Sequence, residues 1–149
     1  MRSVIQRVEM AFVSVDHQII GKIDRGLFVL LGVGAEDQES DARWTAEKLV
    51  ELRAFEDAQG KMNLSVRESG GEILLVSQFT LFGDCRKGMR PSFSSAASLD
   101  KAKMLYELTA EMIREKGIPV ATGKFQAKMK IQSVNDGPVT LLLDSKKIF

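Results

Sequence analysis

The pattern of apolar and polar positions predicts β-strands in the first third of the chain. Apolar residues recur there at even spacing, as on one face of a strand, although Gln6 interrupts that face. A polar turn at Asp16-His17 precedes a second strand over 18–23. The unbroken apolar run 27–33 is typical of a strand buried on both faces. The evenly spaced residues are Val4, Val8, Met10 and Phe12.

Two later stretches carry apolar residues at helical spacing. The first follows the polar segment 36–40 and extends to Arg53, whose charge weakens the end of the stripe. The second follows Ser98, a suitable N-cap residue, and ends before Gly117, which suits the position after a helix. The two stripes are Ala42, Thr45, Ala46 and Leu49, and then Ala102, Leu105, Tyr106, Thr109, Met112 and Ile113.

Turn-forming residues divide the remainder of the chain. Residues 57–60 and 69–71 predict turns, and 72–82 predicts a strand with the polar insert Ser77-Gln78. Residues 83–93 predict a loop. Asn135-Asp136-Gly137-Pro138 predicts a tight turn between two strands, 129–134 and 139–143. We therefore expect one α+β domain over residues 1–149, with a mainly antiparallel sheet of about six to eight strands and about two helices.

Composition narrows the class of protein. The 149 residues are 44% hydrophobic and 28% charged, with net charge +1, as in an ordinary soluble domain. This balance excludes a disordered tail or a polybasic nucleic-acid coat. The single cysteine, Cys85, excludes an intrachain disulfide and fits a reducing compartment. No apolar run approaches the ~20 residues of a membrane span, and Arg7 and Glu9 interrupt any signal-peptide core. We expect a cytoplasmic protein with no membrane partner.

Candidate chemistry is sparse. A Ser-His-Asp triad would need His17, the one histidine, which is more simply a solvated turn residue. No metal-ligand or phosphate-loop motif is present, so we expect neither metal nor cofactor. Ser77 and Thr80 carry hydroxyls at a strand end, but the neighbouring sequence offers no base to activate them. From chemistry alone, pairing with the backbone is the simpler role for both.

Two further motifs leave alternatives open. The loop Arg86-Lys87-Gly88-Met89-Arg90, with Lys124, Lys128 and Lys130, predicts either a phosphate-facing patch or separate solvated side chains. The Gly137–Pro138 bond has a base rate of cis of only ~5–6%, so chemistry alone favours trans. Cys85 has no neighbouring histidine to activate it and is treated as a bystander.

Two motifs occur in a fixed order along the chain. The first is Ser77-Gln78-Phe79-Thr80-Leu81, followed by Gly83-Asp84, Lys87-Gly88 and Arg90-Pro91-Ser92-Phe93, and the second is Asn135-Asp136-Gly137-Pro138-Val139-Thr140. Together they resemble the signatures of the D-aminoacyl-tRNA deacylase family, also called D-tyrosyl-tRNA deacylase. The segments 6–8 and 61–65 fit as well, so the resemblance covers essentially the whole chain.

The resemblance implies a homodimer of a small barrel-like α+β fold that hydrolyses the ester between a D-amino acid and the terminal adenosine of tRNA. It implies that Gly137–Pro138 is cis and enters the partner's active site as a chiral filter, braced by Arg7. Ser77, Gln78, Phe79 and Thr80 would line the ester pocket. Phe125, Ala127 and Met129 are possible adenosine-pocket residues.

The resemblance also suggests why no base is found, because the substrate's 2′-hydroxyl or a water can act instead. The backbone N–H of Phe79 or Thr80 would then stabilise the oxyanion, and Thr80 would position groups. Glycyl-tRNA would also be hydrolysed, since glycine has no side chain to clash. Two alternatives remain: a covalent Thr80 or Ser77 esterase, and a non-catalytic tRNA- or DNA-binding dimer. The chain departs from the family at Gln126, where glycine is common, and at Lys128.

Overall fold

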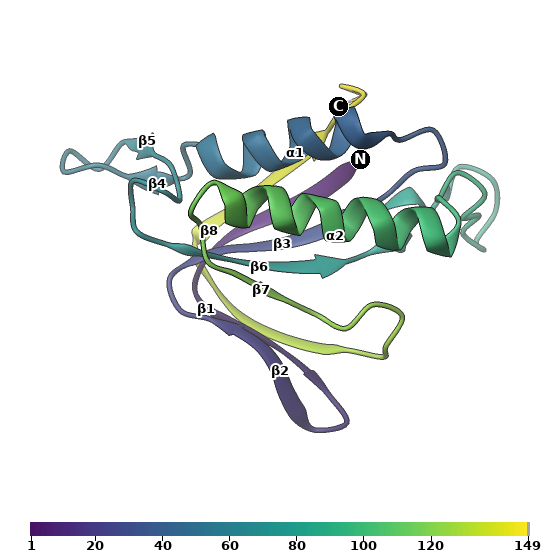
Figure 1. Ribbon diagram of the computed structural model, residues 1–149, viewed down its shortest axis with the longest axis horizontal. Coiled ribbons are helices and arrows are strands. Elements are labelled where there is room, and N and C mark those ends of the chain that lie inside the picture. Colours follow the sequence, from purple (N-terminus) through teal and green to yellow (C-terminus); the bar gives the residue numbers. More distant parts are fainter. Residues whose placement is uncertain (149) are drawn as a thin grey trace.

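The computed structural model describes residues 1–148, and its sheet is organised by one long strand (Figure 1). β1 (Arg2–Val15) pairs along one edge with β3 (Gly26–Gly32) and then with β2 (Gln18–Ile23). Its other edge pairs with β8 (Lys130–Asp144). All three pairings are antiparallel. Short turns join β1 to β2 and β2 to β3, as is usual for antiparallel strands, whereas β8 comes from the C-terminal end of the chain.

The rest of the sheet is parallel, so the expectation of a mainly antiparallel sheet is wrong for this half. β3 pairs with β6 (Glu72–Ser77), and β6 with β7 (Val120–Thr122), both in parallel. Each connection between these strands carries a helix, and a helical crossover returns the chain in the same direction. β2 approaches β7 so closely that a Cβ at Gly21 would lie 2.6 Å from the Thr122 carbonyl oxygen. The mixed sheet is thereby nearly closed into a barrel.

Both predicted helices are present, and they lie side by side on one face of the sheet (Figure 1). α1 (Glu39–Glu51) buries its predicted stripe and ends before Arg53, which is exposed. α2 (Leu99–Glu115) follows Ser98, whose side chain makes no capping hydrogen bond. Gly117 adopts φ +83° after the helix, as predicted for that position.

The central strands are buried on both faces because two cores meet across them. On β3, Leu27, Val29 and Leu31 pack beneath the helices, whereas Phe28 packs inside the barrel with Leu74 of β6. This explains the unbroken apolar run 27–33. A short hairpin, β4 (Phe55–Glu56) and β5 (Met62–Leu64), extends beyond α1. No helix among residues 1–148 is long and apolar enough to cross a membrane.

Two predicted boundaries are wrong. The strand predicted over 72–82 ends at Ser77 and is followed by a 3-10 helix, η1 (Phe79–Phe82). The tight turn predicted at 135–138 is instead a bulge inside β8. Both flanks of that segment pair with β1 in one direction, Asn135 with Val8 and Thr140 with Gln6. The chain therefore bulges without reversing.

Candidate active site

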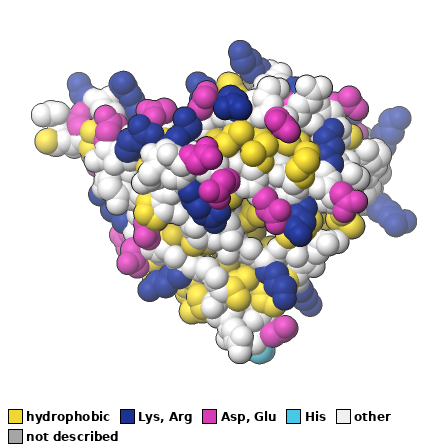
Figure 2. All heavy atoms as spheres, in the orientation of Figure 1, with side chains coloured by type: hydrophobic (Ala, Val, Ile, Leu, Met, Phe, Trp, Pro, Cys, Tyr) yellow, Lys and Arg dark blue, Asp and Glu magenta, His cyan; other side chains and the backbone are white. Residues whose placement is uncertain are grey.

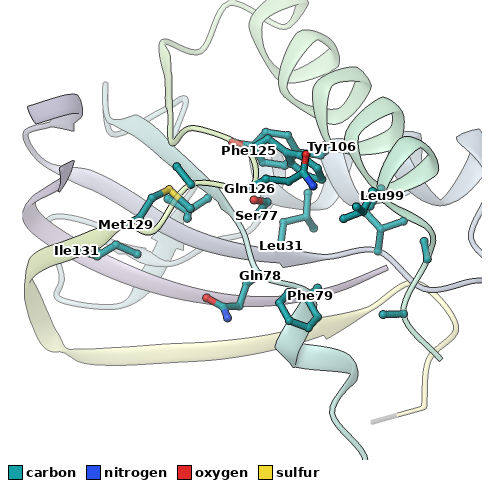
Figure 3. A pocket seen from close by; sticks show the side chains of 16 residues that line it. Leu31, Ser77, Gln78, Phe79, Leu99, Tyr106, Phe125, Gln126, Met129 and Ile131 are labelled. Atoms are coloured by element: carbon teal, nitrogen blue, oxygen red, sulfur yellow. The ribbon is translucent and has the colours of Figure 1, made fainter. Parts of the chain in front are cut away.

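A cavity of about 510 Å³ opens where the parallel strands β3 and β6 end. Parallel strands bring their carboxyl ends to one edge of a sheet, which is where α/β folds commonly bind ligands. Strand residues form one side, α2 a second, and the segment between β7 and β8 a third (Figure 3). The residues that line it are Leu31, Val33, Val76, Ser77, Gln78, Phe79, Ala96, Ala97, Leu99, Ala102, Tyr106, Phe125, Gln126, Ala127, Met129 and Ile131.

Three of the four predicted catalytic positions line this cavity: Ser77, Gln78 and Phe79. The backbone N–H of Gln78 donates to the Leu31 carbonyl at 2.8 Å, which fastens the segment to β3 at the point where β6 ends. Thr80 does not line the cavity, and its side chain is exposed. Its hydroxyl accepts a hydrogen bond from the side-chain amide of Gln78. The geometry therefore links Thr80 to the cavity through Gln78.

No base is found beside these hydroxyls among the residues that line the cavity. His17 lies in the turn between β1 and β2, with φ +65°, and it is exposed. Within residues 1–148, no cluster of three or more His, Cys, Asp or Glu side chains could hold a metal ion. The cavity is therefore an apolar chamber with a polar rim at 77–78, suited to holding a substrate in a fixed orientation.

The predicted adenosine-pocket residues Phe125, Ala127 and Met129 all line the same cavity. Figure 3 shows that Phe125 and Met129 belong to the segment across the cavity from Gln78 and Phe79. Between them, Gln126 has φ +63°, the left-handed conformation that glycine adopts most readily. Although glutamine stands where glycine is common in the family, the backbone of this turn therefore keeps a conformation typical of glycine. Lys128 is exposed. A Cβ at Gly123 would lie 2.6 Å from the Met129 sulfur, so this glycine makes room for the methionine.

Tyr106 is a site residue that sequence reasoning placed only in the helical stripe. Its hydroxyl donates to the Leu75 carbonyl at 2.7 Å, and its ring centre lies 6.1 Å from that of Phe125. Burial raises the pKa of the Tyr106 hydroxyl to about 12. Tyr106 thus stays neutral and forms a fixed wall against Phe125. The one available signal was that Tyr106 is the single tyrosine of the chain and lies in a mostly apolar stripe.

The predicted filter lies apart from this chain's own cavity. The Gly137–Pro138 bond is cis, as the family resemblance implied, and both residues are exposed on β8. Residues 136–139 bulge opposite the single residue Arg7 of β1. Neither glycine nor proline lines the cavity. The structure therefore brings 77–79 and 125–129 together but leaves 137–138 facing outward.

Arg7 is buried beneath that bulge. Its Nη1 donates to the Ala54 carbonyl at 3.0 Å, and its Nη2 lies 3.7 Å from Glu56 Oε1. Its Nε lies 2.9 Å from Asp136 Oδ2 but makes no hydrogen bond, so this contact is an ion pair. Arg7 therefore ties the residue before Gly137 to β1.

Comparison with known proteins extends over the whole chain. A family model described as D-Tyr-tRNA(Tyr) deacylase matches residues 4–144. D-aminoacyl-tRNA deacylases from Thermotoga petrophila and Thermosipho melanesiensis are 58% and 60% identical, with both chains fully covered in each case. The solved structure of a c-Myc DNA unwinding element binding protein is 40% identical. It covers 97% of this chain and 98% of its own, with a TM-score of 0.92.

The fold and these matches define a class of enzyme, the hydrolases that act on aminoacyl-tRNA esters. Within that class, the chain belongs to the D-Tyr-tRNA(Tyr) deacylase family.

Proposed function

We propose that the protein hydrolyses the ester of D-aminoacyl-tRNA, releasing the D-amino acid and free tRNA in the cytoplasm. The observation that carries the proposal is the single cavity that unites 77–79 with 125–129, two segments far apart in sequence. Phe125, Ala127 and Met129 would hold the terminal adenosine on one wall. The ester would then lie against Ser77 and Gln78 on the other.

The proposed mechanism relies on orientation and needs no protein nucleophile. The 2′-hydroxyl of the adenosine, or a water, would attack or assist attack on the ester carbonyl. Neither the Phe79 nor the Thr80 backbone N–H donates to another backbone carbonyl among the described residues, so either can stabilise the oxyanion. Fixed geometry and such donors can each contribute several kcal/mol to catalysis.

Chiral selection is proposed to come from a second copy of the chain. Gly137 and Pro138 are exposed and lie outside their own cavity, so a partner's cavity is the site they could enter. The edge of β8 away from β1 pairs with no strand among residues 1–148, and Val134 and Leu142 are exposed on β8. Such an apolar edge strand suits pairing with another copy.

In this arrangement an L side chain would point into the proline and clash, whereas a D side chain would point outward. The carbonyls of Gly137 and Pro138 would accept hydrogen bonds from the substrate's α-amino group. Arg7 would brace the pair through Asp136. Because glycine has no side chain, glycyl-tRNA would also be hydrolysed.

The test is to compare hydrolysis of D-tyrosyl-, L-tyrosyl- and glycyl-tRNA, with EDTA present in every reaction. We expect rapid loss of the D-ester, slower loss of the glycyl ester, and retention of the L-ester. Hydrolysis of both tyrosyl esters would contradict the filter but retain the esterase. Hydrolysis of none by the folded protein would overturn the proposed activity.

A second candidate function is binding of nucleic acid without catalysis. Its support is the name of the 40% identical structural relative, which describes a DNA-element binding protein, together with exposed lysines at 124, 128 and 130. Equal affinity for charged and uncharged tRNA, with no ester cleavage, would favour this candidate. Cleavage of the ester by the folded protein would exclude it.

A further inference from the structure

An exposed aromatic pair lies at the mouth of the cavity. Phe79 lines the cavity, yet 57% of it is exposed. Its ring meets the ring of Phe93 edge to face, with centres 5.0 Å apart and planes at 64°. Phe93 is itself 37% exposed. Solvent-facing phenylalanines that extend a cavity wall are typical of a surface that stacks against a planar ligand.

The backbone holds this pair in place. Asp84 and Ser92 exchange two backbone hydrogen bonds, of 2.7 and 3.0 Å, and so close the loop between them. A Cβ at Gly83 would lie 3.0 Å from the Phe93 ring, so a larger residue would crowd it. The position of Phe93 beside Phe79 is therefore built into the loop's geometry.

The same loop carries positive charge that the protein leaves uncompensated. Arg86 is paired with Asp84 at 2.7 Å, and this pairing lowers the pKa of Asp84. Lys87 and Arg90 are exposed and form no ion pair within residues 1–148. Lys and Arg side chains project from the right-hand edge of the molecule, where this loop lies in Figure 1 (Figure 2). Two free cations thus lie on the loop that carries Phe93.

We propose that the Phe79–Phe93 pair, with Lys87 and Arg90, binds the single-stranded nucleotides immediately before the terminal adenosine of the tRNA. Aromatic faces beside free cations are the chemistry that binds single-stranded RNA, through base stacking and phosphate contacts. This inference rests on the proposed function, because the adenosine must occupy the cavity for its neighbours to reach the pair. Lys124, Lys128 and Lys130 are also exposed, but the segment that carries them has no exposed aromatic ring on which a base could stack.

The test compares two D-tyrosyl esters, one of whole tRNA and one of adenosine alone. Phe93→Ala is expected to lower kcat/KM for the tRNA ester about 10-fold, the scale of one lost base stack, and to leave the adenosine ester within about 2-fold. Phe93→Tyr keeps a ring and should restore most of the tRNA activity. Unchanged hydrolysis of the tRNA ester by folded Phe93→Ala would overturn the proposal.

The charges are tested by salt dependence. The affinity for tRNA is measured over a range of salt concentrations, and log affinity is plotted against log salt concentration. The double variant Lys87→Ala with Arg90→Ala should give a slope shallower than that of the wild type by about 1.4, the value for two single-strand phosphate contacts. The matched control is Lys124→Ala with Lys130→Ala. If the control variant alone loses slope, the RNA leaves the cavity by the other side and the proposal is wrong.

Direct binding separates this proposal from the proposed activity. Uncharged trinucleotide CCA and adenosine are titrated into wild type and Phe93→Ala. We expect the wild type to bind CCA more tightly than adenosine, and the variant to bind the two alike. Equal affinity of wild type for both would overturn the subsite even if the ester is hydrolysed. A CCA preference without hydrolysis would retain the subsite and contradict only the activity.

Discussion

Arg7 Nε lies 2.9 Å from Asp136 Oδ2, so a buried guanidinium on β1 holds the residue that precedes the exposed Gly137–Pro138 pair. The arginine side chain is 6% exposed, whereas the aspartate is 38% exposed. The contact therefore joins the interior of the sheet to an outward-facing bulge. From this contact we expect Arg7 to shape the bulge as well as to pack beneath it.

Replacing Arg7 tests that role. Arg7→Met keeps an unbranched stem but leaves the buried Ala54 carbonyl without its donor. We expect the free energy of unfolding to fall by about 1–3 kcal/mol, the cost of an unmet buried hydrogen bond. Chiral selectivity should fall as well, measured as the ratio of D- to L-tyrosyl-tRNA hydrolysis. The exposed Arg53→Met serves as the control, and equal effects of the two variants would contradict the assignment.

Thr80 separates positioning from covalent catalysis. Thr80→Val keeps the side-chain shape and removes the hydroxyl that accepts from Gln78. A positioning role predicts a loss of about 10- to 100-fold in kcat, whereas a covalent role predicts a loss on the order of 10⁴ or more. Single-turnover hydrolysis of D-tyrosyl-tRNA measures the difference. Ser77→Ala is run in parallel, and near-total loss in either variant would favour the covalent alternative.

Stability at acid pH should report on Asp41. Burial alone would raise the pKa of this carboxyl, but hydrogen bonds from Lys146, Ser145 and the Gln38 backbone outweigh it and lower the pKa to about 2. The pKa of Asp41 in the folded protein lies below the ordinary 3.8, so the ionised carboxylate stabilises the fold. This stabilisation is complete above pH 3.8 and is lost as pH falls toward about 2.

Lys146→Met removes an ammonium 2.8 Å from Asp41 Oδ2. We expect the Tm of the variant to lie below that of the wild type at pH 5. The two melting curves should converge as pH falls through about 2, because Asp41 becomes protonated in both proteins below its pKa. The lysine is 44% exposed, so the loss should be at most about 1 kcal/mol. Lys103→Met, which removes an exposed pair on α2, is the control. A pH-independent difference for Lys146→Met would count against the linkage.

Gln126 tests the cost of a left-handed residue on the cavity wall. Its φ of +63° carries strain that Gly would remove, while Gly adds freedom to the unfolded chain. We expect Gln126→Gly to change the free energy of unfolding by less than about 0.5 kcal/mol, because these effects oppose each other. The control Gln132→Gly, within β8, should cost about 0.5–1 kcal/mol. Chemical denaturation measures both, and a similar loss in each would contradict the expectation.

Some elements could be predicted because their causes are local. The stripe from Ala42 to Leu49 has helical period, and Gly117 has the freedom that a helix end requires. The run 27–33 indicates a strand with two buried faces. The strand pairing was not predictable in the same way, because the parallel contact of β3 with β6 depends on where α1 returns the chain.

The sequence by itself determined the α+β class, both helices and the motifs at 77–80 and 135–140, because period and residue type act over short distances. Only the tertiary structure decided that Phe125 and Met129 face Ser77 across one cavity while Gly137 faces outward. Likewise, residues 135–138 have a composition typical of a turn but form a bulge, because the chain on both sides of them pairs with β1. The physical reason is that residues distant in sequence meet only where the packed strands and helices place them, and local preference yields to that packing.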